Sequence, residues 1–443
     1  MPLPTARELA RRLRAREVSA VELLDAHLET IAARNPELNA IVTLTPDLAR
    51  AQALRADEAA ARGEWLGPLH GLPVAHKDLQ ETRGVRTTFG SPLYANYVPD
   101  FDTEIVRRMK EAGAVCVGKS NTPEFGAGSQ TFNPVFGKTR NPYDTTKTCG
   151  GSSGGACVAL ATGMVALADG SDTGGSLRNP ASFCGVTGLR TTPGLVPIVP
   201  NACPESPLTV NGPLARNAAD AALLLGVLAG VAPPPMERDF RGVRVGWLGE
   251  IPGLPVEPEV RRVVDGARRR LEKAGCVVED AAFDFEGADE SFRILRAREF
   301  HAWHGGKDLS VVKETVRQEV ERGARLTAAD LERAVALREG LLARLRGFQE
   351  RYEFFALPTV QVAPFDIEQP YVTAINGLEL SSYIDWMRSC YYVSILGVPA
   401  ASTPAGFTAA GLPVGLPLAG RPGADWEVLR LAHALEQVTG NAG

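Results

Sequence analysis

Two serines stand in glycine-rich segments at a spacing that suits joint chemistry. Ser152 lies in the run GGSSGG, and Ser176 lies in DTGGSLRNPA, 24 residues further along the chain. The small residues between them predict a helix from about Gly155 and then a buried strand over residues 165–168. Such a pair of elements folds the chain back and brings the two turns together. Two hydroxyl groups beside flexible backbone N–H groups indicate acyl-transfer chemistry.

A serine hydroxyl becomes a good nucleophile only when a base removes its proton. The six histidines supply no convincing base, whereas Lys77 follows the apolar residues 72–75 of a predicted buried strand in GLPVAHKDL. Burial disfavours an ammonium ion, so it lowers the pKa of a lysine and yields a neutral amine near pH 7. The alternative is a solvated or ion-paired lysine, which is the commoner state of this residue in proteins.

Taken together, these motifs resemble those of the amidase signature family of serine hydrolases. The resemblance runs from about residue 67 to residue 194 and includes NTPEFGAGSQTFNPVFGKTRNPYD before the serines and CGVTGLRTTPG after them. Weaker similarity follows in LGVPAASTPAGFTAAGLPVGLPLAG. The resemblance implies that Ser176 is the nucleophile, that Ser152 is a bridging serine after a cis peptide bond, and that Lys77 is the base. In the implied mechanism Lys77 deprotonates Ser152, Ser152 deprotonates Ser176, and Ser176 attacks the amide carbonyl.

Glycines precede Ser176, and they suit a site that stabilises a developing oxyanion. Such a site needs converging N–H donors, and glycine lets the backbone approach the substrate closely. We expect the backbone of Thr173, Gly174 and Gly175 to contribute together with Ser176. The resemblance adds Gly126 as a position that lines the substrate site.

Three neighbouring residues are expected to support the site. Asp172 and Arg178 flank the nucleophile turn, and we interpret them as an ion pair or hydrogen-bond set that holds it. Ser153 is the rival of Ser152 for the bridging role. The spacing and the resemblance select Ser152, and we expect Ser153 to form local hydrogen bonds or to cap the following helix.

A second motif, GAVCVGKS at residues 113–120, satisfies the pattern of a phosphate-binding loop. In such loops the pattern follows a strand and begins a helix whose amide groups face the phosphates. Here a helix is expected before the motif, over residues 103–112, and a strand within it, over residues 114–117. The following Asn-Thr-Pro turns the chain. The sequence therefore argues against nucleotide binding.

The wider pattern alternates helices and strands, which is typical of an α/β protein. The resemblance implies one large α/β/α domain over residues 1–443, with a mixed central sheet covered by helices on both faces. Within it we expect a helical layer over residues 1–65, a signature core over residues 67–194, and a variable helical region over residues 250–350 that shapes the substrate pocket. Strands are expected near residues 72–76, 114–118, 165–168, 244–248, 354–359 and 400–403.

Four side chains of the variable region are candidates to reach the pocket, although packing is the commoner role of such residues: Glu299, His301, Trp303 and His304. Their roles stay open at this point.

The composition excludes several classes of protein. A formal net charge of −5 without a basic cluster argues against a nucleic-acid partner. No apolar run approaches the roughly 20 residues that span a bilayer, and no signal-peptide pattern is evident, so we expect a cytoplasmic protein. Seven scattered cysteines favour reduced thiols, and neither a metal nor an organic cofactor is implied.

The leading hypothesis is a stand-alone amidase, with a homodimer as the candidate assembly, that hydrolyses a small-molecule amide to the acid and ammonia or an amine. The alternative is the catalytic A-type subunit of an aminoacyl-tRNA amidotransferase complex, which shares the motifs. In that branch of the family the segment after the nucleophile usually reads close to KPTYGRVSR, whereas this chain has LRTTPGLVPIVP. The difference favours the stand-alone enzyme. An inactive binding protein is disfavoured because Lys77, Ser152 and Ser176 are all present.

Overall fold

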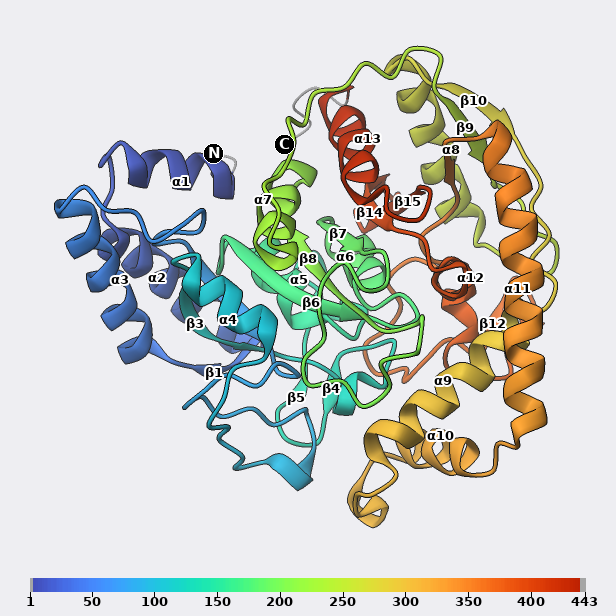
Figure 1. Ribbon diagram of the computed structural model, residues 1–443, viewed down its shortest axis with the longest axis horizontal. Helices are drawn as coiled ribbons and strands as arrows, with labels where there is room; N and C mark the ends of the chain where they lie inside the picture. Colours follow the sequence, from blue (N-terminus) through green and yellow to red (C-terminus); the bar gives the residue numbers. More distant parts are fainter. Residues whose placement is uncertain (1–2, 439–443) are drawn as a thin grey trace.

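A mixed sheet of eleven strands forms the centre of the computed structural model, which describes residues 3–438 (Figure 1). Most neighbouring strands are antiparallel, but the second, third and fourth strands across the sheet are mutually parallel, and so are the last three. The expected mixed central sheet is therefore confirmed. In order across the sheet the strands are β1 (Ile41–Leu44), β3 (Val115–Ser120), β2 (Pro73–Lys77), β6 (Leu167–Asp172), β8 (Val210–Ala215), β7 (Thr187–Arg190), β14 (Ala400–Phe407), β15 (Pro413–Ala419), β11 (Phe354–Ala356), β9 (Arg244–Trp247) and β10 (Val277–Asp280).

Helices cover both faces of this sheet, as the alternation along β7 demonstrates. Gly188 faces the helix α6 (Arg178–Cys184). The hydroxyl of Thr187 instead donates a hydrogen bond to Glu436 of α13 (Asp425–Val438). Successive residues of a strand point to opposite faces, so α6 and α13 lie on opposite sides.

The remaining helices extend these two layers and the ends of the sheet. α5 (Gly154–Ala161) packs against α6, whereas α7 (Ala218–Ala229) and α8 (Pro258–Lys273) pack against α13. The others near the N-terminal end are α1 (Ala6–Arg14), α2 (Ala20–Leu38), α3 (Pro46–Ala61) and α4 (Glu104–Glu111). Two small hairpins lie outside the main sheet, β4 (Phe132–Asn133) with β5 (Gly137–Lys138) and β12 (Ala374–Ile375) with β13 (Leu378–Glu379).

The N-terminal helices begin at the expected signals. Ser19 and Glu22 form a reciprocal capping box at the start of α2. Pro46 occupies the first turn of α3. Between these helices, where we expected helices alone, residues 41–44 form the edge strand β1, antiparallel to β3. A run of four residues is too short for its periodicity to distinguish a strand from a loop.

The strand that leads to the second serine is longer than expected. It begins at Leu167 rather than residue 165 and continues to Asp172 through the polar run DGSD. Asp169 and Asp172 are fully buried. Buried carboxylates require partners, which hydrophobic patterning does not detect. The added length places Ser176 in the turn just beyond the end of the strand.

Long helices form a separate wall beside the sheet, drawn in yellow and orange in Figure 1. They are α9 (Ala288–His304), α10 (Glu314–Ala324) and α11 (Ala328–Arg351), and α9 also packs against α12 (Arg388–Leu396). Of the region expected to shape the pocket, α8 packs against β14 and β15, and β10 is the strand at the far edge of the sheet. The helix that contributes to the cavity is α9.

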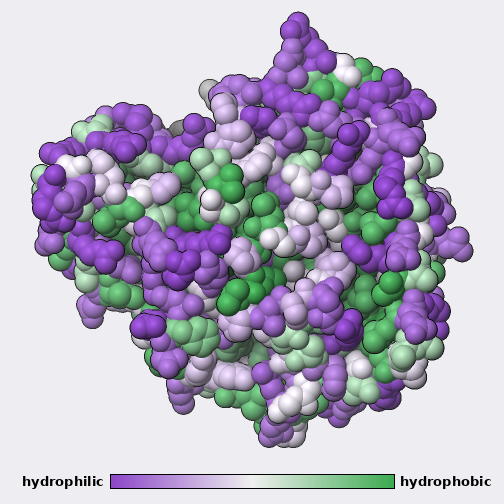
Figure 2. All heavy atoms as spheres, in the orientation of Figure 1, coloured by the Kyte–Doolittle hydropathy of each residue, from purple (hydrophilic) through white to green (hydrophobic). Residues whose placement is uncertain are grey.

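On the face shown in Figure 2, hydrophilic side chains dominate the rim and hydrophobic ones gather toward the middle. Among the helices of residues 3–438, none is long and apolar enough to cross a bilayer.

Candidate active site

Lys77, the last residue of β2, has a fully buried side chain. Burial lowers the pKa of Lys77 to about 7, although the carboxylates of Asp169 and Asp172 partly oppose this effect. A lysine in this state can accept a proton near neutral pH. The Nζ atom lies within hydrogen-bond distance of three hydroxyl oxygens, those of Ser152 at 2.8 Å, Ser153 at 2.9 Å and Ser171 at 3.1 Å.

Both serines of the first turn therefore contact the lysine, but they differ in exposure to the cavity. Ser152 lines the cavity, and Ser153 does not. The peptide bond between Gly151 and Ser152 is cis, as the resemblance implies. Ser153 stands at the N-cap position of α5 without a capping hydrogen bond from its side chain. Its contact with Lys77 was not expected from the sequence.

Ser176 lies in a turn that the carboxylate of Asp172 organises. Asp172 accepts hydrogen bonds from the backbone N–H of Gly175 at 2.8 Å and from that of Leu177 at 3.1 Å. Ser176 lies between these two anchored residues, lines the cavity, and is 9% exposed.

Two buried arginines complete the support of this turn. Arg178 contacts the Asp172 carboxylate at 3.0 Å and Arg190 contacts it at 3.2 Å. Burial opposes ionisation of Asp172, but the two guanidinium groups hold the pKa of this carboxyl well below its usual range. Arg178 also donates to the Cys390 carbonyl and the Ser394 hydroxyl of α12, each at 2.8 Å. Arg190 was not identified from the sequence, although it lies within the motif CGVTGLRTTPG.

The residues that were expected to form an oxyanion site differ in whether their backbone N–H group already has an acceptor within the protein. The N–H of Gly175 is already engaged by Asp172, so Gly175 does not serve as a donor in the way we expected. Across the described residues, the N–H groups of Gly174 and Ser176 donate to no protein acceptor. Thr173 and Gly174 line the cavity together with Ser176.

Asp169 and Ser171 were missed by the sequence analysis. They lie two residues apart on β6 and therefore share a face of the strand. Asp169 accepts the backbone N–H of Lys77 at 3.0 Å and contacts Nδ1 of His76 at 2.6 Å. Burial lowers the pKa of His76, but Cys116 and Asp169 outweigh that effect and raise it to about 9. The signal that could have revealed this cluster is an acidic residue within an otherwise apolar strand.

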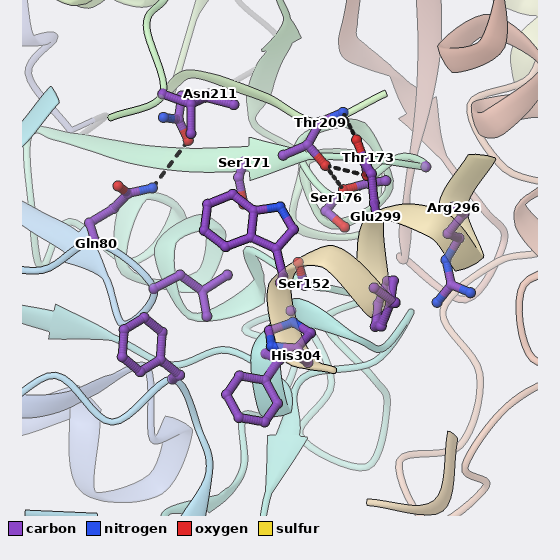
Figure 3. A pocket seen from close by; sticks show the side chains of 18 of the residues that line it. Gln80, Ser152, Ser171, Thr173, Ser176, Thr209, Asn211, Arg296, Glu299 and His304 are labelled. Atoms are coloured by element: carbon purple, nitrogen blue, oxygen red, sulfur yellow. Dashed lines mark hydrogen bonds between the residues drawn. The ribbon is translucent and has the colours of Figure 1, made fainter. Parts of the chain in front are cut away.

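The cavity above the serines has a volume of about 370 Å³ and a largely apolar wall. Ser152 and Ser176 both lie in the close-up of Figure 3. Gly126, with a positive φ of 69°, also lines it, and a Cβ added there would approach the Ser152 Oγ to 3.4 Å. The aromatic residues of the wall include Phe89, Tyr94, Tyr97, Phe125, Phe292 and Trp303.

Three of the four candidates on the variable helices reach the cavity, and one does not. Glu299, Trp303 and His304 of α9 line the cavity, whereas His301 is exposed and does not. Arg296, one turn before Glu299, also reaches the cavity and is paired with Glu319 at 2.8 Å.

The GAVCVGKS segment does not form a phosphate loop. Its last six residues are the strand β3, and no helix begins directly after it. The side chain of Lys119 is buried and donates to the Gln80 carbonyl and, at 2.9 Å, to the Thr82 hydroxyl.

Comparison with known proteins agrees with this geometry. A family model described as Amidase matches residues 22–429. The A-type subunit of glutamyl-tRNA(Gln) amidotransferase from Moorella thermoacetica is 37% identical, over 98% of this chain and 96% of the relative. A bacterial aryl acylamidase described as an amidase signature enzyme superposes with a TM-score of 0.91 at 26% identity, over 98% of this chain and 96% of its own. A solved amidase superposes with a TM-score of 0.90 at 30% identity, over 98% and 99%.

Proposed function

This chain belongs to the amidase signature family, whose members of known structure cleave amide carbon–nitrogen bonds, and we propose that it does so through an acyl-enzyme on Ser176. The observation that carries the proposal is the contact of 2.8 Å between a buried Lys77 and Ser152, in a cavity that also exposes Ser176. In this reading Lys77 is the base, Ser152 the proton relay and Ser176 the nucleophile.

The chemistry follows from these positions. The neutral Lys77 amine accepts the proton of Ser152, Ser152 takes the proton of Ser176, and a bond forms between the Ser176 Oγ and the carbonyl carbon. When the carbon–nitrogen bond breaks, the proton returns through the same relay to the leaving nitrogen. Water then attacks the acyl carbon and gives a proton to the relay. As the bond between the acyl carbon and the Ser176 Oγ breaks, the Oγ takes this proton back and the carboxylic acid leaves.

The N–H groups of Gly174 and Ser176 are the proposed oxyanion donors. Both are free of protein acceptors within the described part of the chain, and both residues line the cavity. Donors fixed before the reaction stabilise a negative charge without reorganisation, and the loss of one such donor typically costs about 3 kcal/mol of barrier. Gly175 instead donates its N–H to the Asp172 carboxylate and so helps to fix the turn.

The cavity wall indicates the class of substrate. Aromatic and aliphatic side chains dominate it, and a cavity of about 370 Å³ has room for a compact organic molecule. Amides with an aromatic or apolar acyl group bury the most apolar surface there. We therefore propose a free amidase for small amides of this kind.

Sequence identity favours a second candidate. The Moorella relative is 37% identical to this chain, against 26% and 30% for the two solved amidases. This similarity fits the catalytic component of a glutamyl-tRNA(Gln) amidotransferase at least as well as it fits a free amidase. In that role the ammonia released from an amide donor would serve a second reaction carried out with partner proteins.

One experiment separates the two candidates. The purified chain is given a panel of aromatic, aliphatic and amino-acid amides, and ammonia is measured, with Ser176→Ala as the control. Turnover of apolar amides that is lost in Ser176→Ala supports the free amidase. Turnover limited to glutamine supports the amidotransferase component. Full turnover by Ser176→Ala contradicts the acyl-enzyme in either case.

A further inference from the structure

A hydrogen-bonded chain links the wall helix α9 to the turn that carries the nucleophile. Glu299 is 4% exposed, and its carboxylate accepts the backbone N–H of Thr209 at 3.3 Å and the Thr209 hydroxyl at 2.9 Å. The hydroxyls of Thr209 and Thr173 are 2.7 Å apart. Dashed lines in Figure 3 mark these contacts. Thr173 is the first residue after β6 and precedes Ser176 by three positions.

The number of protons gives the chain a direction. A threonine hydroxyl has a single hydrogen to donate. Because Thr209 gives its hydrogen to Glu299 when that carboxyl is ionised, the hydrogen between the two threonines must come from Thr173. In this hydrogen-bonded chain, Thr173 therefore donates to Thr209, and Thr209 donates to Glu299.

Glu299 differs from Asp172 in that no cation in the described part of the chain contacts its carboxylate directly, although the charge of Arg190 favours its ionised form. None of the ion pairs among residues 3–438 includes Glu299, whereas Asp172 has two arginines. Burial raises the pKa of Glu299, and the hydrogen bonds from Ser206 and Thr209 oppose this effect. A buried carboxylate is stable only when hydrogen bonds replace its hydration. Both Glu299 oxygens meet this need through Thr209, so the carboxylate and the threonine fix each other.

The turn needs such a restraint on its first residue. Two glycines follow Thr173, and neither has a side chain whose hydrogen bonds could hold the turn. Asp172 anchors the later part of the turn through the N–H of Gly175. The Thr173 hydroxyl anchors the earlier part.

We propose that Glu299 is a positioning residue for the nucleophile turn, acting through Thr209 and Thr173. The inference rests on the proposed function, because it concerns the placement of the donors and of Ser176. Through this chain, the helix that shapes the substrate cavity also sets the geometry of the reacting groups.

The principal test removes one hydroxyl without changing the shape of its residue. Thr209→Val should lower kcat by about tenfold to a hundredfold, since a hydrogen bond to a charged group is lost, while KM stays within about twofold. Thr209→Ser, which restores a hydroxyl, should recover most of the lost kcat. A purely structural role of this residue would not separate kcat from KM in this way.

A double-mutant cycle tests the path of the effect. Once Thr209→Val has broken the chain, adding Glu299→Gln should lower kcat by less than about a further twofold. Alone, Glu299→Gln should lower kcat, because an amide has a single acceptor oxygen for the two Thr209 donors. Fully additive losses would overturn the proposed path.

Thr187 offers a matched control. Its hydroxyl also donates to a buried glutamate, Glu436, at 3.1 Å, but on the α13 side of the sheet. Thr187→Val should keep the kcat and KM of the parent protein, and circular dichroism with thermal unfolding should show that every variant is folded.

Two outcomes would overturn the proposal. If folded Thr209→Val retains the parent kcat, the chain does not position the turn. If Thr209→Val raises KM alone, the pair contacts the substrate instead. Both differ from a failure of the proposed function, which would appear as full activity of Ser176→Ala in the same assays.

Discussion

Lys77 experiences two opposing effects on its charge. Removal from water favours the neutral amine, and the nearby carboxylates favour the ammonium ion. Asp172 is neutralised by two arginines, and Asp169 is in contact with His76. Burial has the larger effect, so the pKa of Lys77 falls to about 7.

This pKa predicts the pH dependence of activity. The base must be neutral, so kcat/KM should be low in acid, rise as pH passes through about 7, and level off above it. Initial rates across this range, measured with a substrate whose own charge is constant, would test the expectation. A kcat/KM that already reaches its plateau well below pH 6 would contradict Lys77 as the base.

A second prediction compares the same substitution at the two adjacent serines, Ser152 and Ser153. Both hydroxyls contact the same Nζ, but Ser152 lines the cavity and Ser153 does not. Ser152→Ala should therefore lower kcat by about a hundredfold or more, as expected for a group in the proton path. Ser153→Ala should lower kcat by about tenfold at most. Equal losses in steady-state assays would leave the relay unassigned.

At this scale the sequence predicted the residues with distinctive motifs and missed those defined by their partners. Lys77, Ser152 and Ser176 stand in recognisable patterns, and the structure places them at one cavity wall or directly behind it. Ser171 and Arg190 gain significance only from the fold, because strand pairing brings each to a partner distant in sequence. Gly175 shows the same limit, since no pattern reveals the direction of an N–H group.

At the scale of elements, the turn after β6 depends on close packing as well as on hydrogen bonds. Gly175 has a φ of +131°, and a Cβ added to it would lie 2.6 Å from the Cβ of Cys390 on α12. This contact explains why the turn has no room for a side chain.

Gly175→Ala should accordingly be damaging to both stability and activity. Strain at positive φ costs about 1 kcal/mol, and the clash with α12 adds about 1–3 kcal/mol. Urea unfolding would measure the change. Gly194→Ala is the control, because Gly194 also has a positive φ, of 87°, but nothing lies within 4 Å of the added Cβ. Similar losses in the two variants would show that strain, rather than the clash, controls this position.

Element boundaries were predicted best where local chemistry marks them. The capping box at Ser19 and the proline at residue 46 marked two helix starts correctly. The strand expected over residues 354–359 ends at Ala356, because the chain leaves the sheet although its residues stay buried. Burial outside a strand produces the same apolar pattern as burial within one.

At the scale of the whole molecule, the class of fold could be predicted but the order of the strands could not. The alternation of elements and the family motifs pointed to a mixed sheet between helices. The insertion of β14 and β15 between β7 and β11 depends on long-range pairing that no local pattern encodes. The resemblance did place the wall of the pocket within residues 250–350, and three of the four candidates named there, Glu299, Trp303 and His304, line the cavity.

The central position of the hairpin formed by β14 and β15 leads to a prediction about truncation. A chain that ends at residue 398 lacks β14, β15 and α13, so β7 and β11 each lose a neighbouring strand and α7 and α8 lose a helix against which they pack. Such a chain should give no soluble, cooperatively unfolding protein, because exposed strand edges promote aggregation. A chain that ends at residue 438 retains every described element and serves as the control. Soluble, active protein from the shorter chain would contradict a central role of the hairpin.

The position of the hairpin also has a consequence for biosynthesis. A ribosome releases the chain from its N-terminus, so the strands on both sides of the gap emerge well before the two strands that fill it. The nucleophile turn also depends on a later element. Arg178, which supports the turn, donates hydrogen bonds to a carbonyl and a hydroxyl group of α12. The sheet of a nascent chain must therefore remain incompletely folded until β15 has emerged, and the enzyme is expected to acquire activity only after that point.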